Sequence, residues 1–232
     1  MQKTIYINGA NGRVGQALNA LATDETWYRF STDIKTADLV IDFSSPTGLL
    51  EGLSLSQQHS IPFLSGTTGI EQQHLDALDK AGQDIAILWS ANMSIGMNLL
   101  YQLSAKLATQ LPQADIEIFE AHHRYKKDAP SGSAIQLGEH ICVAKGQSLN
   151  QQAVFDRSQQ LKARTKDEIG FSVMRSGDIV GEHTALFGLD GERLELTHRA
   201  TDRAIFARGA LHAGHWLLKQ QPGRYTFIDA LS

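Results

Sequence analysis

The residues best suited to chemistry lie between Glu120 and Ala134, in the run EAHHRYKKDAPSGSA. This run places two histidines and three fixed cations directly before a Pro-Ser-Gly-Ser segment that is typical of a helix start. Imidazoles donate and accept protons near neutral pH, and the free amides of a helix start bind carboxylate or phosphate. The run therefore predicts a site that binds a small, multiply anionic molecule and protonates it.

The adjacent histidines, His122 and His123, follow an alternating segment that predicts a strand. Because neighbouring side chains on a strand point to opposite faces, we expect one histidine to react and the other to bind. The alternative is that both lie at the surface. His183 and His198 stand in other alternating segments, where a packed or hydrogen-bonded role is expected.

The sequence lacks the motifs that are typical of several other chemistries. No His or acidic pair has a zinc spacing such as H-E-x-x-H, so no catalytic metal is predicted. Neither G-x-S-x-G nor G-x-x-x-x-G-K-[ST] occurs, which argues against hydrolases and kinases. Cys142 is the only cysteine, so an intrachain disulfide and a thiolate metal cluster are excluded, and a role in helix packing is expected.

A glycine-rich turn between the first strand and the first helix predicts a dinucleotide site. There, glycines let the backbone approach a pyrophosphate that lies on the helix N-terminus. The spacing is G-x-x-G-x-x-G, with an asparagine, which tolerates positive φ, where glycine is common. A plain tight turn is the alternative, and the arginine of the turn could meet a phosphate. The turn consists of Gly9, Ala10, Asn11, Gly12, Arg13, Val14 and Gly15.

Two further segments follow the carboxyl ends of predicted strands, where open α/β sheets bind ligands. They are Gly66, Thr67, Thr68 and Gly69, and Ser90, Ala91, Asn92 and Met93. Their small residues and amide could lie against a nicotinamide, although ordinary strand-to-helix connections look similar. Asp33 is the candidate acid for the adenosine ribose, with simple solvent exposure as the alternative.

Short apolar strands alternate with helices over the first ninety residues, which predicts a parallel sheet covered on both faces. Beyond residue 92, several strands follow one another without helices, which predicts an antiparallel or mixed sheet. Strands are expected at residues 4–8, 28–32, 39–43, 61–65, 85–89, 116–120, 170–175, 179–187 and 194–199. Helices are expected up to residue 22, from Pro46, up to residue 81, and at 94–110, 131–144 and 204–218, with an exposed polar excursion at 145–166.

The predicted fold is therefore an N-terminal Rossmann-type α/β domain, residues 1–93 completed by 204–232, and a C-terminal α+β mixed-sheet domain, residues 94–203. The net charge of −4 gives no global attraction for nucleic acid or an anionic membrane. Residues 1–8 predict a strand, without the apolar core and small-residue cleavage site of a signal peptide. No apolar run approaches the roughly 20 residues of a membrane span. A cytoplasmic protein is expected.

Taken together, these segments closely resemble the bacterial 4-hydroxy-tetrahydrodipicolinate reductases (dihydrodipicolinate reductases) of lysine and diaminopimelate biosynthesis. The motifs run in family order over most of the chain. They are the Gly9-to-Gly15 turn, IDFS at 41–44, GTTG at 66–69, NMSIGMN at 92–98, the run at 120–134 and GDIVGEHT at 177–184.

The resemblance implies an oxidoreductase that uses NADH or NADPH to reduce a cyclic dicarboxylate, and a homotetramer formed by the C-terminal domain. It implies that His122 is the proton donor/acceptor, Lys126 a second proton donor and His123 a substrate-binding residue. Gly132 and Ser133 would grip a substrate carboxylate. Residues 9–14, 66–68 and 90–93 resemble the cofactor-binding segments.

Some features depart from the family, and other readings remain open. Tyr125 stands where the family often has histidine, and Ser133 where threonine is usual. The segment between Gly15 and Asp42 is shorter than in typical members, so the choice between NADH and NADPH stays open. The rivals are another small-acid dehydrogenase, such as one acting on an aspartate-derived semialdehyde, and a non-catalytic dinucleotide-sensing protein.

Overall fold

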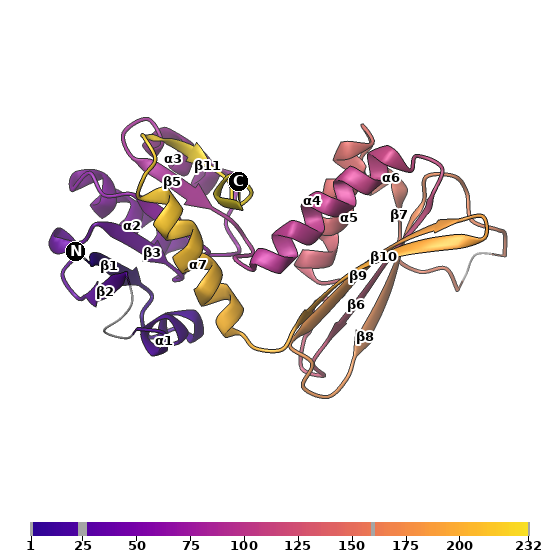
Figure 1. The fold of residues 1–232 in the computed structure, drawn as a ribbon, viewed down its shortest axis with the longest axis horizontal. Coiled ribbons are helices and arrows are strands. Elements are labelled where there is room, and N and C mark those ends of the chain that lie inside the picture. Colours follow the sequence, from indigo (N-terminus) through magenta and orange to yellow (C-terminus); the bar gives the residue numbers. More distant parts are fainter. Residues whose placement is uncertain (1, 23–26, 159–160, 232) are drawn as a thin grey trace. The chain divides into compact units, whose positions relative to one another are not determined.

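The computed structural model describes residues 2–22, 27–158 and 161–231, which form two compact units (Figure 1). The first unit contains Met1–Ile95 and Arg203–Ser232, and the second contains Gly96–Asp202. This division differs from the expected domains at residues 94, 95 and 203.

The first unit is built on a six-stranded parallel sheet in the order β11-β5-β4-β3-β1-β2. Its strands are β1 (Lys3–Asn8), β2 (Tyr28–Ser31), β3 (Leu39–Asp42), β4 (Phe63–Ser65), β5 (Ala86–Trp89) and β11 (Gly223–Tyr225). Its helices are α1 (Arg13–Ala20), α2 (Pro46–Gln58), α3 (Gln72–Ala81) and α7 (Ala204–Leu217), with the short 3-10 helices η1 (Ile34–Thr36) and η2 (Asp229–Leu231). The predicted Rossmann-type parallel sheet is confirmed.

The strand order reverses direction at β1, which has β2 on one side and β3 on the other. Ligands of open α/β sheets bind outside the carboxyl ends of the strands at such a switch point. Helices cover both faces of the sheet: Leu39 and Ile41 of β3 pack in the core that α1 and α7 share, while Val40 packs in the core with α2 and α3.

Helix α7 comes from the end of the chain yet packs in the core of the first unit. Its Gly209 lies close to the loop after β5, because a Cβ at this position would lie 1.7 Å from the carbonyl oxygen of Met93. Only glycine lets the helix and this loop approach so closely. The return of the final helix to the first unit thus shapes the loop that carries Met93.

The second unit contains a five-stranded mixed sheet in the order β10-β9-β6-β8-β7. Its strands are β6 (Asp115–His122), β7 (Ala153–Val154), β8 (Ile169–Arg175), β9 (Gly181–Leu189) and β10 (Glu192–Ala200), and its helices are α4 (Ile95–Gln110), α5 (Gly132–Ala144) and α6 (Leu149–Gln152). Strand β6 pairs parallel with β8 and antiparallel with β9, which confirms the predicted mixed sheet. Cys142 is buried in the core of this unit, and burial raises the pKa of its thiol.

Most described residues of the segment 145–166 are exposed, as predicted, but the segment also contains short regular elements. Within its described residues, α6 and β7 form, Leu149 packs into the core, and Lys145 Nζ lies 2.8 Å from Asp167 Oδ1.

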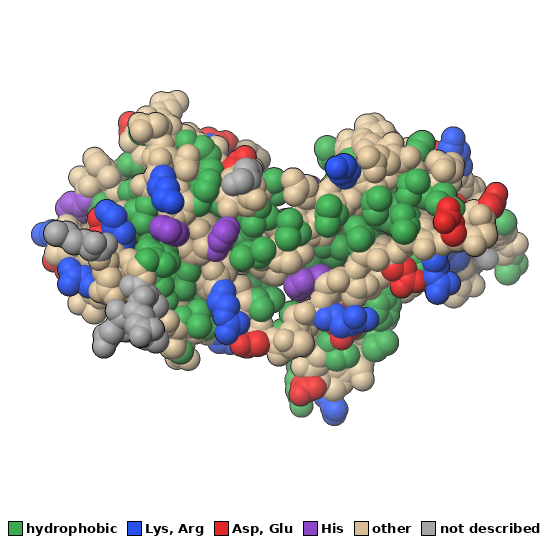
Figure 2. Space-filling model, viewed as in Figure 1, with side chains coloured by type: hydrophobic (Ala, Val, Ile, Leu, Met, Phe, Trp, Pro, Cys, Tyr) green, Lys and Arg blue, Asp and Glu red, His purple; other side chains and the backbone are tan. Residues whose placement is uncertain are grey.

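Acidic and basic side chains are interspersed on the face shown in Figure 2. Among the described residues, no helix combines the length and apolar character that a membrane crossing requires.

Candidate functional site

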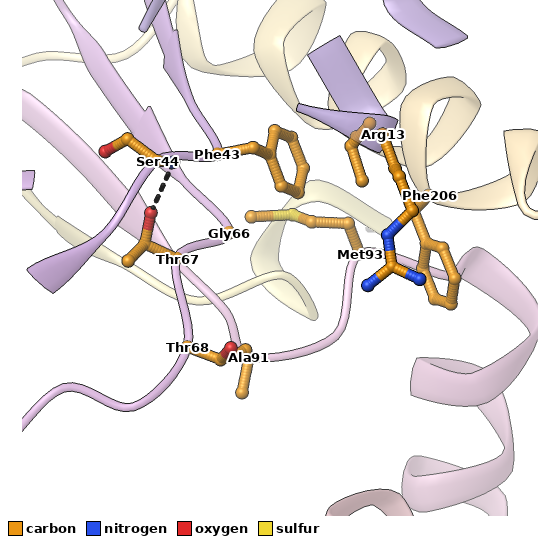
Figure 3. A pocket seen from close by; sticks show the side chains of 10 residues that line it. Arg13, Phe43, Ser44, Gly66, Thr67, Thr68, Ala91, Met93 and Phe206 are labelled. Atoms are coloured by element: carbon orange, nitrogen blue, oxygen red, sulfur yellow. Dashed lines mark hydrogen bonds between the residues drawn. The ribbon is translucent and has the colours of Figure 1, made fainter. Parts of the chain in front are cut away.

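A cavity of about 320 Å³ lies at the carboxyl ends of β1, β3, β4 and β5 in the first unit (Figure 3). It brings together parts of all three segments predicted to bind a cofactor. Its lining residues are Arg13, Val14, Phe43, Ser44, Gly66, Thr67, Thr68, Ala91, Met93 and Phe206. Of these, Phe43, Ser44 and Phe206 were not predicted as site residues.

The glycine turn has the geometry that a dinucleotide requires. Gly9 has a φ of +86°, and a Cβ at this position would lie 2.5 Å from the carbonyl oxygen of Phe43. A Cβ at Gly15 would lie 2.5 Å from the carbonyl oxygen of Gly9, so helix and strand meet closely. The positive φ falls on Gly9 and not on Asn11. Helix α1 begins directly after Gly12, without a side-chain cap on its amides, so the turn fits a pyrophosphate.

The buried carboxylate of Asp42 fixes the loops around this cavity. Its Oδ1 accepts hydrogen bonds from Asn8 Nδ2 (2.9 Å) and Ser44 Oγ, and its Oδ2 accepts from Ser65 Oγ and Thr67 Oγ1 (both 2.7 Å). These donors lie in or just after β1, β3 and β4. A buried charge is tolerated where hydrogen bonds satisfy it, and here it joins three strand ends.

Thr67 is held from several sides as a result. Its Oγ1 donates to Asp42. The same oxygen accepts from the backbone N–H of Ser44 (3.0 Å), and Figure 3 shows this second bond. Its carbonyl oxygen accepts a 2.9 Å hydrogen bond from Trp89 Nε1 at the end of β5. The loop that lines the cavity after β4 therefore has little freedom.

The remaining predicted cofactor residues lie elsewhere in the first unit. Ala10 lines a second cavity of about 290 Å³ with Ser31 and Thr32 beside β2. Asp33 is exposed, and its Oδ1 caps η1 by accepting from the backbone N–H of Lys35 (3.0 Å). In the loop after β5, Ser90 Oγ donates to the carbonyl of Asn92, and Asn92 Oδ1 accepts from the N–H of Ser94.

In the second unit, Glu120 and His122 stand two residues apart on β6 and therefore share one face. Glu120 Oε2 lies 2.5 Å from His122 Nδ1, and the carboxylate is 1% exposed. A carboxylate accepts only, so Nδ1 carries a proton and Nε2 is the nitrogen left for chemistry. A Cβ at Gly181 of β9 would lie 3.0 Å from that Nε2, so the glycine leaves space beside it.

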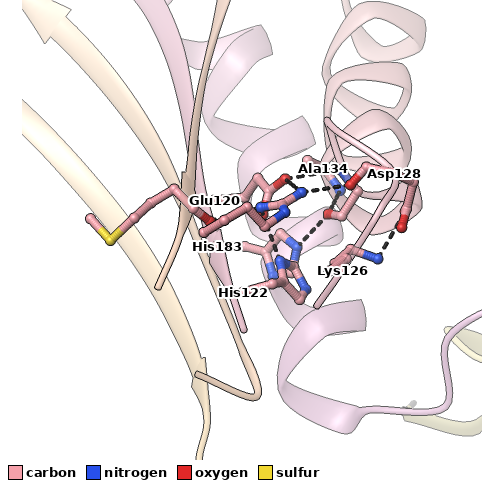
Figure 4. A network of polar contacts seen from close by, with 9 residues as sticks. Glu120, His122, Lys126, Asp128, Ala134 and His183 are labelled. Atoms are coloured by element: carbon pink, nitrogen blue, oxygen red, sulfur yellow. Dashed lines mark hydrogen bonds and ion pairs between the residues drawn. The ribbon is translucent and has the colours of Figure 1, made fainter. Parts of the chain in front are cut away.

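Arg175 completes the surroundings of Glu120, which Figure 4 shows beside His122. It stands opposite His122 on β8 and binds the carboxylate with both terminal nitrogens, Nη1 to Oε2 and Nη2 to Oε1, each at 2.8 Å. The backbone N–H of Ser131 donates to Oε1 (3.0 Å). Burial by itself would raise the pKa of Glu120, but the hydrogen bonds from His122, Arg175 and Ser131 lower it to about 2.

His183 stands opposite Glu120 on β9, with its ring edge-on to that of His122 at a centroid distance of 5.2 Å. Its Nε2 lies 3.0 Å from Ser131 Oγ, which also caps α5 by accepting from the N–H of Ala134. Burial, together with the charge of a protonated His122, lowers the pKa of His183 to about 3. His183 is therefore neutral and belongs to this cluster, as well as being packed.

The other predicted residues of this unit lie around the same cluster. Lys126 Nζ donates to Asp128 Oδ2 (2.8 Å), and this bond lowers the pKa of the Asp128 carboxyl. Gly132 and Ser133 form the first turn of α5, directly after its cap Ser131. The half-buried His123 follows β6, with its ring 6.4 Å from that of Tyr125.

The predicted set of site residues omitted residues that contribute to the candidate site in each unit. The carboxylates Asp42 and Glu120 belong to noted motifs, but they were not assigned roles. Spacing of two residues on a strand could have joined Glu120 to His122. Arg175 could not be found in this way, because it reaches the cluster through the pairing of β6 with β8.

Two family models match the chain. The model described as "Dihydrodipicolinate reductase, C-terminus" matches residues 96–231, and the one described as "Dihydrodipicolinate reductase, N-terminus" matches residues 25–93. The glycine turn of residues 9–15 precedes both matches. The C-terminal match includes α7, which packs in the first unit.

Two relatives with the same enzyme name are similar to the chain over most of its length. The chain is 48% identical over 202 residues to the 4-hydroxy-tetrahydrodipicolinate reductase of Pseudoalteromonas atlantica, covering 87% of this chain and 76% of the relative. It is 43% identical over 230 residues to the protein of that name from Pseudoalteromonas translucida, covering 97% and 86%.

Among solved structures, a dipicolinate-bound dihydrodipicolinate reductase from Paenisporosarcina sp. TG-14 matches with a TM-score of 0.78 and 19% identity, covering 97% of this chain and 98% of that one. At this identity the likeness concerns the fold. The family models and the relatives at 43% and 48% identity confirm the predicted resemblance: the chain belongs to the dihydrodipicolinate reductase family.

Proposed function

We propose that the protein reduces 4-hydroxy-tetrahydrodipicolinate to tetrahydrodipicolinate with loss of water, in lysine and diaminopimelate biosynthesis. Relatives 43% and 48% identical carry this activity in their names. The observation that carries the proposal is the bond between Glu120 Oε2 and His122 Nδ1, in a cluster that includes the start of α5. This arrangement combines a proton-exchanging nitrogen with a site for a carboxylate.

His122 is the proposed proton donor and acceptor, acting through Nε2, and Lys126 the second proton donor. Hydride addition to a conjugated C=N/C=C system leaves negative charge on the ring, which a nearby acid must neutralise. A positioned acid contributes roughly 10²–10⁴-fold to the rate. Glu120 supports this role because it fixes the orientation of the imidazole.

Gly132 and Ser133 are the proposed partners of one substrate carboxylate, and His123 and Lys126 add further polar contacts. The first-turn amides of the 13-residue helix α5 carry the positive end of its dipole. A Cβ at Gly132 would meet no atom within 4 Å, so a carboxylate oxygen has room there. A doubly charged substrate explains why so many donors and cations gather in this segment.

NADH or NADPH is the proposed cofactor, and when bound it supplies the hydride. The glycine turn from Gly9 to Val14 would hold the pyrophosphate, with Arg13 able to pair with a phosphate. Gly66, Thr67, Thr68 and residues 90–93 would contact the nicotinamide half, since several of them line the same cavity. Asp33 remains the proposed ribose-binding acid.

A homotetramer is proposed for the assembly. In support, the face of the second sheet opposite to Glu120 contains a cavity of about 410 Å³. It is lined by side chains of β6, β8, β9 and β10, among them Phe119, Thr184, Leu186 and Thr197. Light scattering coupled to size-exclusion chromatography measures the assembly directly, and a monomer or dimer would contradict the proposal.

The test of the function is a coupled assay. The purified protein receives substrate generated in place from pyruvate and aspartate semialdehyde by the preceding synthase, and oxidation of NADH or NADPH is followed. We expect oxidation that depends on the synthase, and the ratio of the two rates gives the cofactor preference. Dinucleotide binding without oxidation would favour the non-catalytic protein. Oxidation of NADH or NADPH with aspartate semialdehyde alone would favour the rival small-acid dehydrogenase, with the aldehyde as the hydride acceptor.

The variant His122→Ala tests the proposed proton-donor role of His122 in the same assay. We expect turnover to fall about 10²–10⁴-fold, with the Kd of the dinucleotide nearly unchanged, since His122 lies in the other unit. The matched control is His59→Gln, an exposed histidine at the end of α2. Turnover within a few-fold of the parent would remove His122 from the proton-donor role.

A further inference from the structure

The carboxylate of Glu120 is saturated by four donors. Arg175 supplies two of them, Nη1 and Nη2, His122 Nδ1 the third and the backbone N–H of Ser131 the fourth. The Glu120 side chain is 1% exposed and that of Arg175 19% exposed. A two-pronged guanidinium–carboxylate pair of this kind has one geometry, so it fixes the oxygen that faces His122.

Arg175 also reaches a third part of the site. Its Nη2 donates to the carbonyl oxygen of Asp128 (2.6 Å), whose side chain pairs with Lys126. One guanidinium on β8 thus connects the strand that carries His122 and the loop that carries Lys126. Through Glu120 it is also linked to Ser131, which begins α5.

We propose that Arg175 is a positioning residue that acts through Glu120: it fixes the tautomer and direction of the His122 imidazole and holds the Lys126 loop beside it. The kinetic part of this inference rests on the proposed reductase function. Arg175 does not need to touch the substrate for this role, and nothing in the family resemblance assigned it one.

Charge gives Arg175 a second effect. A lone buried carboxylate stabilises an imidazolium strongly and opposes release of its proton. The Arg175 guanidinium offsets that charge, and its removal would leave the carboxylate uncompensated beside the imidazole. Among the described residues, the other titratable groups around the cluster are His183 on β9, which is neutral, His198, which stands opposite it on β10, and Lys126 and Asp128, which pair with each other.

The experiment compares Arg175→Lys and Arg175→Gln with the parent in the coupled assay. We expect kcat to fall about 100-fold in both, as for a reacting group displaced by roughly 1 Å, with the KM of the dinucleotide unchanged. The alkaline limb of the profile of kcat against pH should move to higher pH in Arg175→Gln and much less in Arg175→Lys, which keeps the charge. The control is Arg193→Gln, from an exposed Arg–Glu pair of the same unit.

A second readout does not need the reaction. In protein labelled with ¹⁵N-histidine, the His122 signals, assigned by their loss in His122→Ala, should report Nδ1–H in the parent and a mixture of tautomers in Arg175→Gln. If circular dichroism shows that Arg175→Gln does not fold, both measurements are made on Arg175→Lys.

The two hypotheses fail differently. A parent without synthase-dependent oxidation overturns the proposed function, and the tautomer measurement still tests Arg175. An active parent whose folded Arg175 variants keep its kcat, its pH profile and the Nδ1–H tautomer overturns the positioning role. A lower yield of folded protein with parent-like kinetics would make the ion pair structural only, which also overturns it.

Discussion

The hydroxyl of Thr67 donates a 2.7 Å hydrogen bond to Asp42, and both side chains are buried although they lie 25 residues apart in the chain. The same hydroxyl accepts from the backbone N–H of Ser44. Ser44 and Thr67 both line the candidate cofactor cavity, whereas Asp42 does not. The shape of the cavity therefore depends on a carboxylate beneath it.

Asp42→Asn should weaken dinucleotide binding without changing a lining residue. The amide nitrogen would face two donors in place of an acceptor, and an unsatisfied buried group costs about 1–3 kcal/mol. We expect a lower free energy of unfolding and a higher Kd, measured by urea denaturation and calorimetric titration. Asp76→Asn, an exposed carboxylate that accepts from Gln72, is the control. An unchanged Kd would show that the loops keep their shape without Asp42.

Ser133→Ala should raise the KM for the dicarboxylate and leave kcat nearly unchanged. A hydrogen bond to a charged group contributes about 1.5–3 kcal/mol, so the expected increase is roughly 10–100-fold. An interaction equal in ground and transition states changes KM alone. Ser131→Ala is the contrasting variant, because loss of the α5 cap costs about 1 kcal/mol of stability. A parent-like KM in Ser133→Ala would remove this residue from the carboxylate site.

Local patterns were sufficient to predict most of the fold. Pro46 does begin α2, with Ser45 Oγ accepting from the N–H of Gly48, and the apolar run at Leu39 to Ile41 is buried on both faces. Strand β11 was not predicted, because its three residues, Gly223–Tyr225, have no apolar run and form a strand only by pairing with β5. Pairing partners lie outside any local pattern.

The residues of the candidate site likewise fall into two groups: those that a local sequence pattern brings together, and those that only the pairing of strands brings together. Glu120 and His122 are neighbours on one strand, so a period of two places them together. Arg175 and His183 come 55 and 63 residues after Glu120 and reach it only through the registers of β8 and β9. Phe206 lines the candidate cofactor cavity because α7 returns to the first unit. These contacts depend on strand order, which no segment specifies alone.

Gly209→Ala should disturb cofactor binding from outside the cavity. The new Cβ would lie 1.7 Å from the carbonyl oxygen of Met93, so α7 or the loop after β5 must move. We expect a several-fold higher dinucleotide Kd and a loss of stability of about 1–3 kcal/mol, as for other overpacked sites. Gly188→Ala, where the nearest atom is 3.7 Å away, controls for the substitution itself. Parent-like binding would mean that the loop adapts without cost to the cavity.

His183→Gln should flatten the pH dependence of stability in mildly acidic solution. Burial keeps the pKa of His183 at about 3 in the folded protein, against an ordinary 6.5. As pH falls below 6.5, the unfolded chain therefore binds a proton that the folded protein does not, and the free energy of unfolding decreases by up to about 1.4 kcal/mol per pH unit. Gln keeps a hydrogen-bonding group near Ser131 but does not titrate.

The measurement is urea denaturation of parent and variant between pH 7 and 5. This range lies above the ordinary 4.5 of Glu120, whose pKa of about 2 in the folded protein removes stability only at lower pH. We expect the parent to lose stability more steeply than His183→Gln, while the exposed-site variant His59→Gln follows the parent. Equal slopes in parent and His183→Gln would mean that His183 binds a proton in the folded state. His122 would then have a cation beside it, at a ring-centroid distance of 5.2 Å.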